Sequence, residues 1–164
     1  MKEVALTEPL VDNVEVKALV TDPCAVMTLD LYTVNPSDLA FKAPFNLTAK
    51  RNDFIHALIA WFDIEFTSCH KPIRFSTGPH AKYTHWKQTV FYLQDILTVE
   101  ENESVSGVLE NKPNQKNKRD LDISISYRFD TADENRSCGA FCKYKMYIKL
   151  HPSRMLSCAN NRVH

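Results

Sequence analysis

An aromatic segment, residues 83–92, carries the side chains whose chemistry is easiest to interpret from the sequence. It sets the imidazole of His85 beside the indole of Trp86, directly before an apolar run typical of a strand. The face of a Trp ring attracts ammonium and guanidinium groups by about 0.5–2 kcal/mol, depending on how dry the site is. A neighbouring histidine can orient such a group or exchange protons near neutral pH. The segment therefore suits the binding of a cationic side chain.

The same side chains also have an ordinary structural interpretation. A loop imidazole such as His85 can be held by backbone hydrogen bonds alone, and an indole such as Trp86 buries about 150–250 Å² and often anchors a core. Tyr83 is expected to pack rather than to react. His56 lies inside a long apolar run, so we interpret it as a histidine of the core or of a strand face. Taken alone, the residues leave both interpretations of the His85–Trp86 pair open.

The triplet Thr84-His85-Trp86 closely resembles the threonine-histidine-tryptophan loop of protein arginine N-methyltransferases. Flanking segments match the family in the same order: Lys50-Arg51-Asn52-Asp53, His56-Ala57-Leu58, Ile64-Glu65-Phe66-Thr67, Phe75-Ser76-Thr77 and Arg119-Asp120-Leu121-Asp122. The resemblance runs from about Lys2 to Met146 and is strongest to the type I branch, whose members form asymmetric dimethylarginine. It maps only to the C-terminal β-barrel half of these enzymes.

The resemblance implies roles for the loop residues. In the family, the loop packs across the boundary to the donor-binding domain, where its histidine pairs with an acidic group and helps to wall the guanidinium pocket. We therefore expect His85 to be catalytic and Thr84, His85 and Trp86 to bind substrate. Implied partners are arginine-glycine-rich or histone-like protein substrates, the donor-binding domain, and further copies in a full-length homo-oligomer. The implied location is cytoplasmic and nuclear.

A site for the methyl donor is not recognisable in the sequence. Binding S-adenosylmethionine calls for a glycine-rich turn between a strand and a helix, where the backbone can approach the ligand closely. The three glycines, Gly78, Gly107 and Gly139, are too widely spaced to form a G-x-G pattern. The paired-glutamate loop that holds the guanidinium in the family also has no counterpart. We therefore expect that this chain alone binds no cofactor, lacks a Rossmann-like domain and is inactive.

The cysteines indicate neither a disulfide framework nor a metal site. Their number is odd and they lack paired C-x-x-C spacing: Cys24, Cys69, Cys138, Cys142 and Cys158. Cys69 and His70 are adjacent, and neighbouring residues of a strand point to opposite faces. The two side chains are therefore poorly placed to bind one metal ion together. We expect free thiols and no bound metal.

Composition narrows the class of protein. A length of 164 residues with 44% hydrophobic content fits one domain with one core. Twenty acidic and twenty basic side chains give no net charge, which disfavours binding to nucleic acid or anionic membranes. No run approaches the ~20 apolar residues of a membrane span. The basic stretch Lys112–Arg119 has no interleaved aromatic residue, so we interpret it as a solvated hairpin tip.

The elements that must position the loop are expected to be strands. Hydrophobic residues alternate with polar ones over Arg119–Phe129 and again over Cys142–Leu150, which predicts half-buried strands. Phe54–Phe66 is almost wholly apolar, which indicates a strand buried on both faces or strongly bent, with a short helix as the alternative. Turn-rich stretches between them favour an all-β barrel or sandwich. Pro9–Val20 approximates a helical stripe, which predicts one short N-terminal helix.

Residues 1–147 are thus expected to form one substrate-binding β-barrel domain, beginning near the end of the family's dimerisation arm. Residues 148–164 are expected to form an atypical, unstructured tail, because they lack periodicity. The favoured function is the barrel of a type I arginine methyltransferase. The alternative is a non-catalytic interaction or regulatory module that pairs with a full-length methyltransferase. A barrel that binds nucleic acid is the third and weakest possibility.

Overall fold

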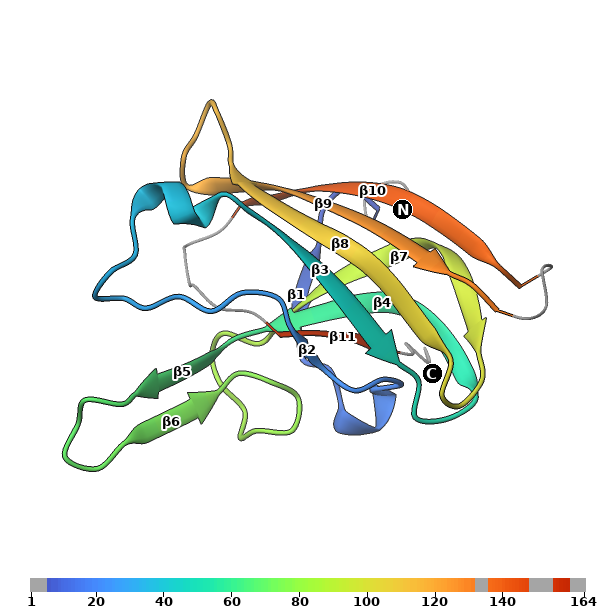
Figure 1. The fold of residues 1–164 in the computed structure, drawn as a ribbon, viewed down its shortest axis with the longest axis horizontal. Coiled ribbons are helices and arrows are strands. Elements are labelled where there is room, and N and C mark those ends of the chain that lie inside the picture. Colours follow the sequence, from blue (N-terminus) through green and yellow to red (C-terminus); the bar gives the residue numbers. More distant parts are fainter. Residues whose placement is uncertain (1–5, 132–135, 148–154, 160–164) are drawn as a thin grey trace.

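The computed structural model describes residues 6–131, 136–147 and 155–159, and nearly all of its regular structure is β (Figure 1). The strands are β1 (Leu10–Asp12), β2 (Cys24–Ala25), β3 (Phe41–Thr48), β4 (Asp53–Trp61), β5 (Asp63–Phe66), β6 (Ile73–Ser76), β7 (Gln88–Val99), β8 (Ser104–Pro113), β9 (Asp120–Phe129), β10 (Cys138–Tyr147) and β11 (Met155–Ala159). Two 3-10 turns accompany them, η1 (Val16–Ala18) and η2 (Pro36–Leu39). The all-β prediction is confirmed. None of the helices in the described residues is long or apolar enough to cross a membrane.

Two antiparallel sheets face each other, and a hairpin projects from them (Figure 1). One sheet has the order β1-β7-β4-β11-β2 and the other the order β10-β9-β8-β3. The hairpin is β5-β6, which extends beyond the end of β4. At one seam between the sheets, Thr21 pairs with Ala49 in an isolated bridge. The arrangement is therefore barrel-like, with the hairpin as its appendage.

The other seam is fastened by a buried tyrosine. The Tyr144 hydroxyl on β10 donates a hydrogen bond of 2.7 Å to the backbone carbonyl oxygen of Tyr92 on β7. Its ring meets Phe91 edge to face, with ring centroids 5.0 Å apart. Burial raises the pKa of Tyr144 well above its ordinary value, because an ionised phenol would lose its hydration. Tyr144 therefore stays a neutral hydrogen-bond donor over the whole physiological pH range.

The main core lies between the two sheets, and the predicted alternation of β9 supplies much of it. Ile123, Ile125, Tyr127 and Phe129 are buried. The same alternation holds in the described part of β10, where Cys142, Tyr144 and Met146 are buried. Both predictions are confirmed for these residues, while Ile148 and Leu150 lie outside the described part of the chain.

The apolar run at Phe54–Phe66 is a strand, as predicted, and not a helix. It forms β4 and then, after a break at Phe62, β5 of the hairpin. The pairing of β4 with β7 shifts register between Ile55 and Ala57, which marks a bulge. Between these two pairs β7 runs from Leu97 to Tyr92, so the extra residues of the bulge belong to β7. The faces of β4 change at the same place, since Ile55 and Leu58 both enter the main core although they are three positions apart.

The opposite face of β4 forms a second, smaller core. Ala57, Ile59 and Trp61 on this face are buried together with Val90 of β7. The N-terminal segment covers them through Val14 and Leu19. From Ala57 to Trp61, β4 is therefore buried on both faces, which explains why this part of its sequence shows no alternation.

The helix predicted for Pro9–Val20 is wrong for most of that segment. Leu10–Asp12 form the strand β1, which pairs with β7 so that Leu10 lies opposite Val90. Only Val16–Ala18 are helical, in a single 3-10 turn. The physical reason is that pairing with the edge of β7 and cover of the second core outweigh a weak helical propensity.

Hydrogen bonds from a distant arginine hold the part of the N-terminal segment around η1. The Arg51 guanidinium donates to the carbonyl oxygens of Leu19 and Lys17 at 2.8 and 2.9 Å. It also pairs with the Asp53 carboxylate at 2.9 Å. These bonds replace the internal hydrogen bonds that a helix would supply.

The tail expected to be unstructured contains a strand. Met155–Ala159 form β11, which lies between β4 and β2 in the five-stranded sheet. The expectation is wrong for these five residues, because a strand edge within the sheet gives them backbone partners that the sequence does not reveal. The remainder of residues 148–164 lies outside the described residues.

A partly buried ion pair joins the end of the β9–β10 connection to the β7–β8 turn. Arg136 donates to both carboxylate oxygens of Glu103, at 2.9 and 3.2 Å. Thr131 and the backbone N–H of Glu100 donate to the same carboxylate, at 2.6 and 2.7 Å. Burial of Glu103 acts to raise its pKa, but these hydrogen bonds and the Arg136 charge outweigh it and lower the pKa below its ordinary value.

Glu103→Gln should therefore lower the free energy of unfolding in a pH-dependent way. The folded pKa is depressed, so the ionised carboxylate contributes stability above its ordinary pKa of 4.5, and this contribution is lost as the pH falls through the lower, folded pKa. We expect a loss of about 1 kcal/mol at pH 7, shrinking steadily below pH 4.5. Urea unfolding over this pH range measures it, with Glu101→Gln in the same exposed turn as the control. An equal loss at every pH would contradict the assignment.

Candidate functional site

The Thr84-His85-Trp86 loop lies between the β5–β6 hairpin and the start of β7. Tyr83 is 67% exposed and Trp86 is 43% exposed, while His85 is exposed and Thr84 is half-buried. All three predicted site residues thus lie together on one loop at the base of the hairpin. His56, by contrast, lies on β4 and does not belong to this loop.

Trp86 is packed and accessible at the same time. Its ring stacks on Phe75 of β6, with centroids 6.1 Å apart and an interplanar angle of 28°. Phe62 meets it edge to face, with centroids 6.0 Å apart. Aromatic pairs at such distances and angles are favourable contacts. Trp86 therefore has a fixed orientation, yet it leaves much of its surface for a cation or for another domain.

His85 and Thr84 differ in what surrounds them. The His85 ring lies edge-on to Trp86 with centroids 6.5 Å apart. The Thr84 hydroxyl is buried and finds no hydrogen-bond partner among the described residues. A hydroxyl left unpaired in the interior is costly. Thr84 is thus a donor or acceptor still available at the foot of the loop.

The turn that ends the loop is held by Lys87. Its backbone has a φ of 54°, in the left-handed region that costs a non-glycine residue about 1–2 kcal/mol. Its N–H donates to the Thr84 carbonyl oxygen at 3.3 Å, and its ammonium pairs with Asp12 of β1 at 3.3 Å. The backbone N–H of Asn13 and the Lys87 ammonium lower the pKa of the Asp12 carboxyl. The N-terminal segment therefore helps to hold the loop.

A buried polar network connects the loop to the rest of the fold. The Gln88 amide nitrogen donates to the Thr77 carbonyl oxygen at 2.7 Å, and its amide oxygen accepts from the Val14 N–H at 2.8 Å. The Thr77 hydroxyl in turn donates to the Phe62 carbonyl oxygen at 3.0 Å. Gln88 and Thr77 thus clamp the N-terminal segment, the base of the hairpin and the start of β7 around the loop.

Sequence reasoning missed this network. The available signal was a glutamine, Gln88, at the head of an apolar run, together with the matched segment that ends at Thr77. A polar side chain at such a place is buried only if its hydrogen bonds are met. Its partners come from positions 11 and 74 residues away, which the sequence does not reveal.

Gly78 shows how closely the loop lies against β4. A Cβ atom at this position would fall 2.7 Å from Nε1 of the buried Trp61 and 2.8 Å from Cε1 of His80. Real Cβ atoms do not approach other atoms so closely. Glycine is therefore required here for the loop to cross the Trp61 indole.

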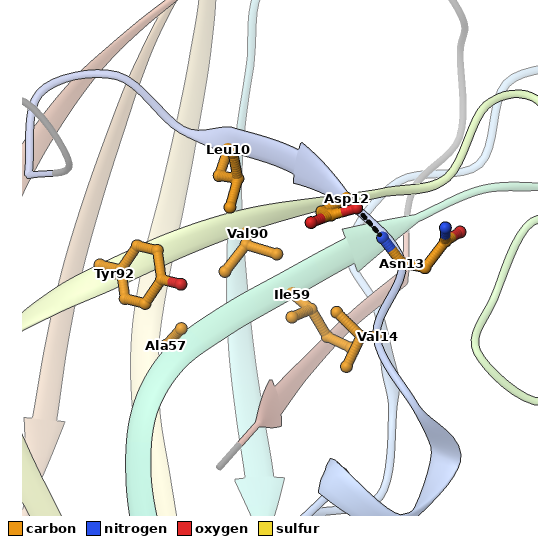
Figure 2. Close-up of a pocket in the computed structure, with 8 residues that line it drawn as sticks. All are labelled: Leu10, Asp12, Asn13, Val14, Ala57, Ile59, Val90 and Tyr92. Carbon is orange, nitrogen blue, oxygen red and sulfur yellow. Dashed lines mark hydrogen bonds between the residues drawn. The ribbon is translucent and has the colours of Figure 1, made fainter. Parts of the chain in front are cut away.

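A small pocket lies near the loop but is separate from it. It has a volume of about 60 Å³, well below the ~300–1,000 Å³ typical of small-molecule sites. Figure 2 shows the N-terminal segment on one side of it and β4 and β7 on the other, with these lining residues: Leu10, Asp12, Asn13, Val14, Ala57, Ile59, Val90 and Tyr92. None of Thr84, His85 and Trp86 lines it.

The described residues contain neither a metal-binding group nor a disulfide. No group of three or more His, Cys, Asp or Glu side chains in residues 6–131 and 136–146 is placed to hold a metal ion. Cys24, Cys69, Cys138 and Cys142 are free thiols, and the side chain of Cys158 lies outside the description.

Comparison with known proteins agrees with this geometry. The model of the arginine methyltransferase oligomerization subdomain matches residues 1–133. Protein arginine N-methyltransferase 1 of Schizosaccharomyces pombe is 57% identical over 129 residues, covering 79% of this chain and 38% of the relative. Protein arginine N-methyltransferase 1.1 of Arabidopsis thaliana is 51% identical over 127 residues, covering 77% and 33%.

Solved structures share the fold. The Trypanosoma brucei PRMT1 enzyme-prozyme heterotetrameric complex with AdoHcy contains a chain with a TM-score of 0.82 and 35% identity, covering 88% of this chain and 45% of that one. Arabidopsis thaliana protein arginine methyltransferase 10 gives a TM-score of 0.78 at 19% identity, which supports the fold alone.

The barrel-like sheets and the Thr84-His85-Trp86 loop define the class as the C-terminal, barrel-like part of arginine methyltransferases. The chain belongs to the protein arginine N-methyltransferase family, and its relatives fit the type I branch. The resemblance found in the sequence is thus confirmed. The chain spans about a third to two fifths of the length of the curated relatives it matches.

Replacing Gln88 by leucine should destabilise the fold around the loop. The change leaves the buried Thr77 carbonyl and the part-buried Val14 N–H without these partners, at roughly 1–3 kcal/mol for each buried group. We expect a fall of about 2–4 kcal/mol in the free energy of unfolding, and faster amide hydrogen exchange in residues 77–87. Gln94→Leu on the exposed part of β7 is the matched control. Equal effects from the two variants would remove Gln88 from this role.

Proposed function

We propose that this chain is the substrate-binding barrel of a type I protein arginine N-methyltransferase, which transfers methyl groups from S-adenosylmethionine to arginine side chains of proteins. One observation carries the proposal. The family's loop triplet is present as Thr84-His85-Trp86, and the buried Gln88–Thr77 network fixes it with His85 and part of Trp86 exposed. An exposed and oriented loop of this kind suits contact with a second domain and with a guanidinium.

The loop would act by positioning. Methyl transfer needs donor and acceptor held in line, and it needs the guanidinium charge held away from the attacking nitrogen. Trp86 offers an aromatic surface for the cationic arginine, and His85 stands beside it to pair with an acidic group of the donor-binding domain. The carboxylates that localise the guanidinium charge belong elsewhere in the full-length enzyme.

The described residues do not fit the methyl donor. Their helical segments are 3-10 turns of three and four residues, too short to follow a donor-binding turn. Gly78 lies against Trp61, while Gly107 and Gly139 lie within β8 and β10. No glycine is therefore placed where a nucleotide-like ligand could approach the backbone at the start of a helix. We assign no step of the reaction to a donor bound here.

The remaining properties of the full-length enzyme follow from the same proposal. The substrates would be arginine-glycine-rich or histone-like proteins, and the location cytoplasmic and nuclear. The barrel would work beside a donor-binding domain in a homo-oligomer. Membership of the oligomerization subdomain family supports the assembly.

A second candidate is a non-catalytic module that pairs with a full-length methyltransferase. One observation favours it, namely that the similar Trypanosoma brucei structure is a complex of enzyme and prozyme. In this case the loop and hairpin would serve as a contact surface without taking part in the reaction. Donor binding by the native gene product separates the two candidates, because only a complete enzyme binds S-adenosylmethionine.

The 164-residue chain should show no donor binding and no activity of its own. Titration with S-adenosylmethionine in a calorimeter should give only heats of dilution, because the described residues offer no donor site. Incubation with labelled donor and an arginine-glycine-rich peptide should give no methylarginine above a blank without protein. The full-length Schizosaccharomyces pombe relative is the positive control. Methylarginine formed by the chain alone would refute this prediction.

His85→Ala should slow turnover in a chimera that joins this barrel to the donor-binding domain of the same relative. Because the donor lies in the other domain, its Kd should stay unchanged while kcat falls at least about tenfold. This is less than the ~10²–10⁴-fold that acid–base groups contribute, because His85 would act by positioning. Trp86→Ala should instead raise the peptide KM, and thermal melting shows whether the loop has unfolded. His70→Ala, an exposed histidine in the β5–β6 turn, is the control. A His85→Ala rate within about twofold of the parent would make the histidine structural.

A further inference from the structure

The last strand in the described chain occupies an inner place in its sheet. β11 pairs with β4 over five positions, from Met155 opposite Trp61 to Ala159 opposite Ala57. On its other side, Met155 and Leu156 pair with Ala25 and Cys24 of β2. Figure 1 shows β11 in dark red beside β4, far in sequence from both neighbours. Removing β11 would open a gap between β4 and β2.

The edge of β4 that faces this gap needs a partner. Every residue from Ala57 to Trp61 is buried, and β7 pairs with β4 on the opposite side only. Backbone N–H and C=O groups of a buried strand must be paired, because water does not reach them. An open edge of this kind accepts an added strand through main-chain hydrogen bonds. The site therefore selects an extended segment rather than a particular side chain.

The two sides of this pairing come from different parts of the sequence. β2 and β4 lie within residues 1–133, the part matched by the family model. β11 lies outside that match. The acceptor edge is thus built by the family-matched part of the chain, and its occupant is supplied by a segment that the match does not include.

We propose that the edge of β4 at Ala57–Trp61, together with β2, is a strand-acceptor site for an extended segment. In this chain Met155–Ala159 fill it in cis, and the partner that fits it in trans is the same segment of a second copy. The register of five consecutive pairs with β4 defines how the segment lies. Since a tethered segment competes at a high effective concentration, exchange between copies occurs when the cis pairing is weakened.

The test uses the full chain with Ser157→Pro or Cys158→Pro. Successive N–H groups of a strand point to opposite sides, so one of the two substitutions removes a hydrogen bond to β4. Ser157→Val keeps the N–H and is the control. In one of the two proline variants, we expect amide exchange at residues 57–61 to be faster than in the wild-type chain. In the valine variant it should match the wild-type rate, and exchange in β9 should be unchanged in all variants. Protected amides at 57–61 in both proline variants would overturn the proposal.

A fluorescent peptide with the sequence of residues 153–161 then reports on the acceptor directly. Fluorescence anisotropy should show that the proline variant binds this peptide at least about tenfold more tightly than the wild-type chain, whose site is filled in cis. The same peptide with proline in place of both Ser157 and Cys158 should bind neither chain, because it lacks a backbone N–H that pairs with β4. Equal binding of the peptide by variant and wild type would overturn the proposal.

A second measurement covers the case in which both proline variants fail to fold. The wild-type chain is incubated with millimolar unlabelled peptide, and hydrogen exchange is followed in its own residues 155–159. We expect these amides to lose protection while residues 57–61 keep theirs, since the peptide replaces the cis strand. Unchanged protection at 155–159 would overturn the proposal without the need for a variant.

Discussion

Burial of β4 on both of its faces is the constraint on which the rest of this structure depends. One face enters the main core through Ile55 and Leu58, and the other forms a second core that includes Trp61. A strand so enclosed leaves no backbone group to water, so both of its edges must be paired as well. β7 and β11 satisfy the edges, and the N-terminal segment covers the second core.

The Thr84-His85-Trp86 loop takes its position from this arrangement. β4 continues through Phe62 into the hairpin, and Thr77 closes the base of that hairpin by hydrogen bonds with Phe62. Gln88 links Thr77 to the N-terminal segment that covers β4. The loop is therefore anchored at both ends by hydrogen bonds to residues beside the second core, namely Phe62, which follows Trp61, and Val14, which covers it. Its stability and its orientation cannot be changed independently.

In the proposed enzyme, there is a physical reason why the barrel orients the substrate while another domain binds the donor. A barrel of antiparallel strands offers rigid edges and loops, which suit the orientation of a substrate, but it offers no long helix whose N-terminus could hold a nucleotide-like donor. In the proposed enzyme, the donor site and the carboxylates would come from another domain. His85 and Trp86, exposed beside the hairpin, are the groups that such a domain would meet.

The sequence by itself determined the all-β class and the family. Alternation in Leu121–Phe129 reports one buried face directly, and Thr84-His85-Trp86 with its flanking segments is specific enough to assign the class. Only the tertiary structure decided that Pro9–Val20 is mostly extended, that Met155–Ala159 form a strand, and which groups bind Gln88. The physical reason is distance along the chain, because local propensity reports what a segment prefers alone. An extended backbone paired with a distant strand, and an amide bound to distant carbonyl and N–H groups, gain their stability from partners that local pattern does not record.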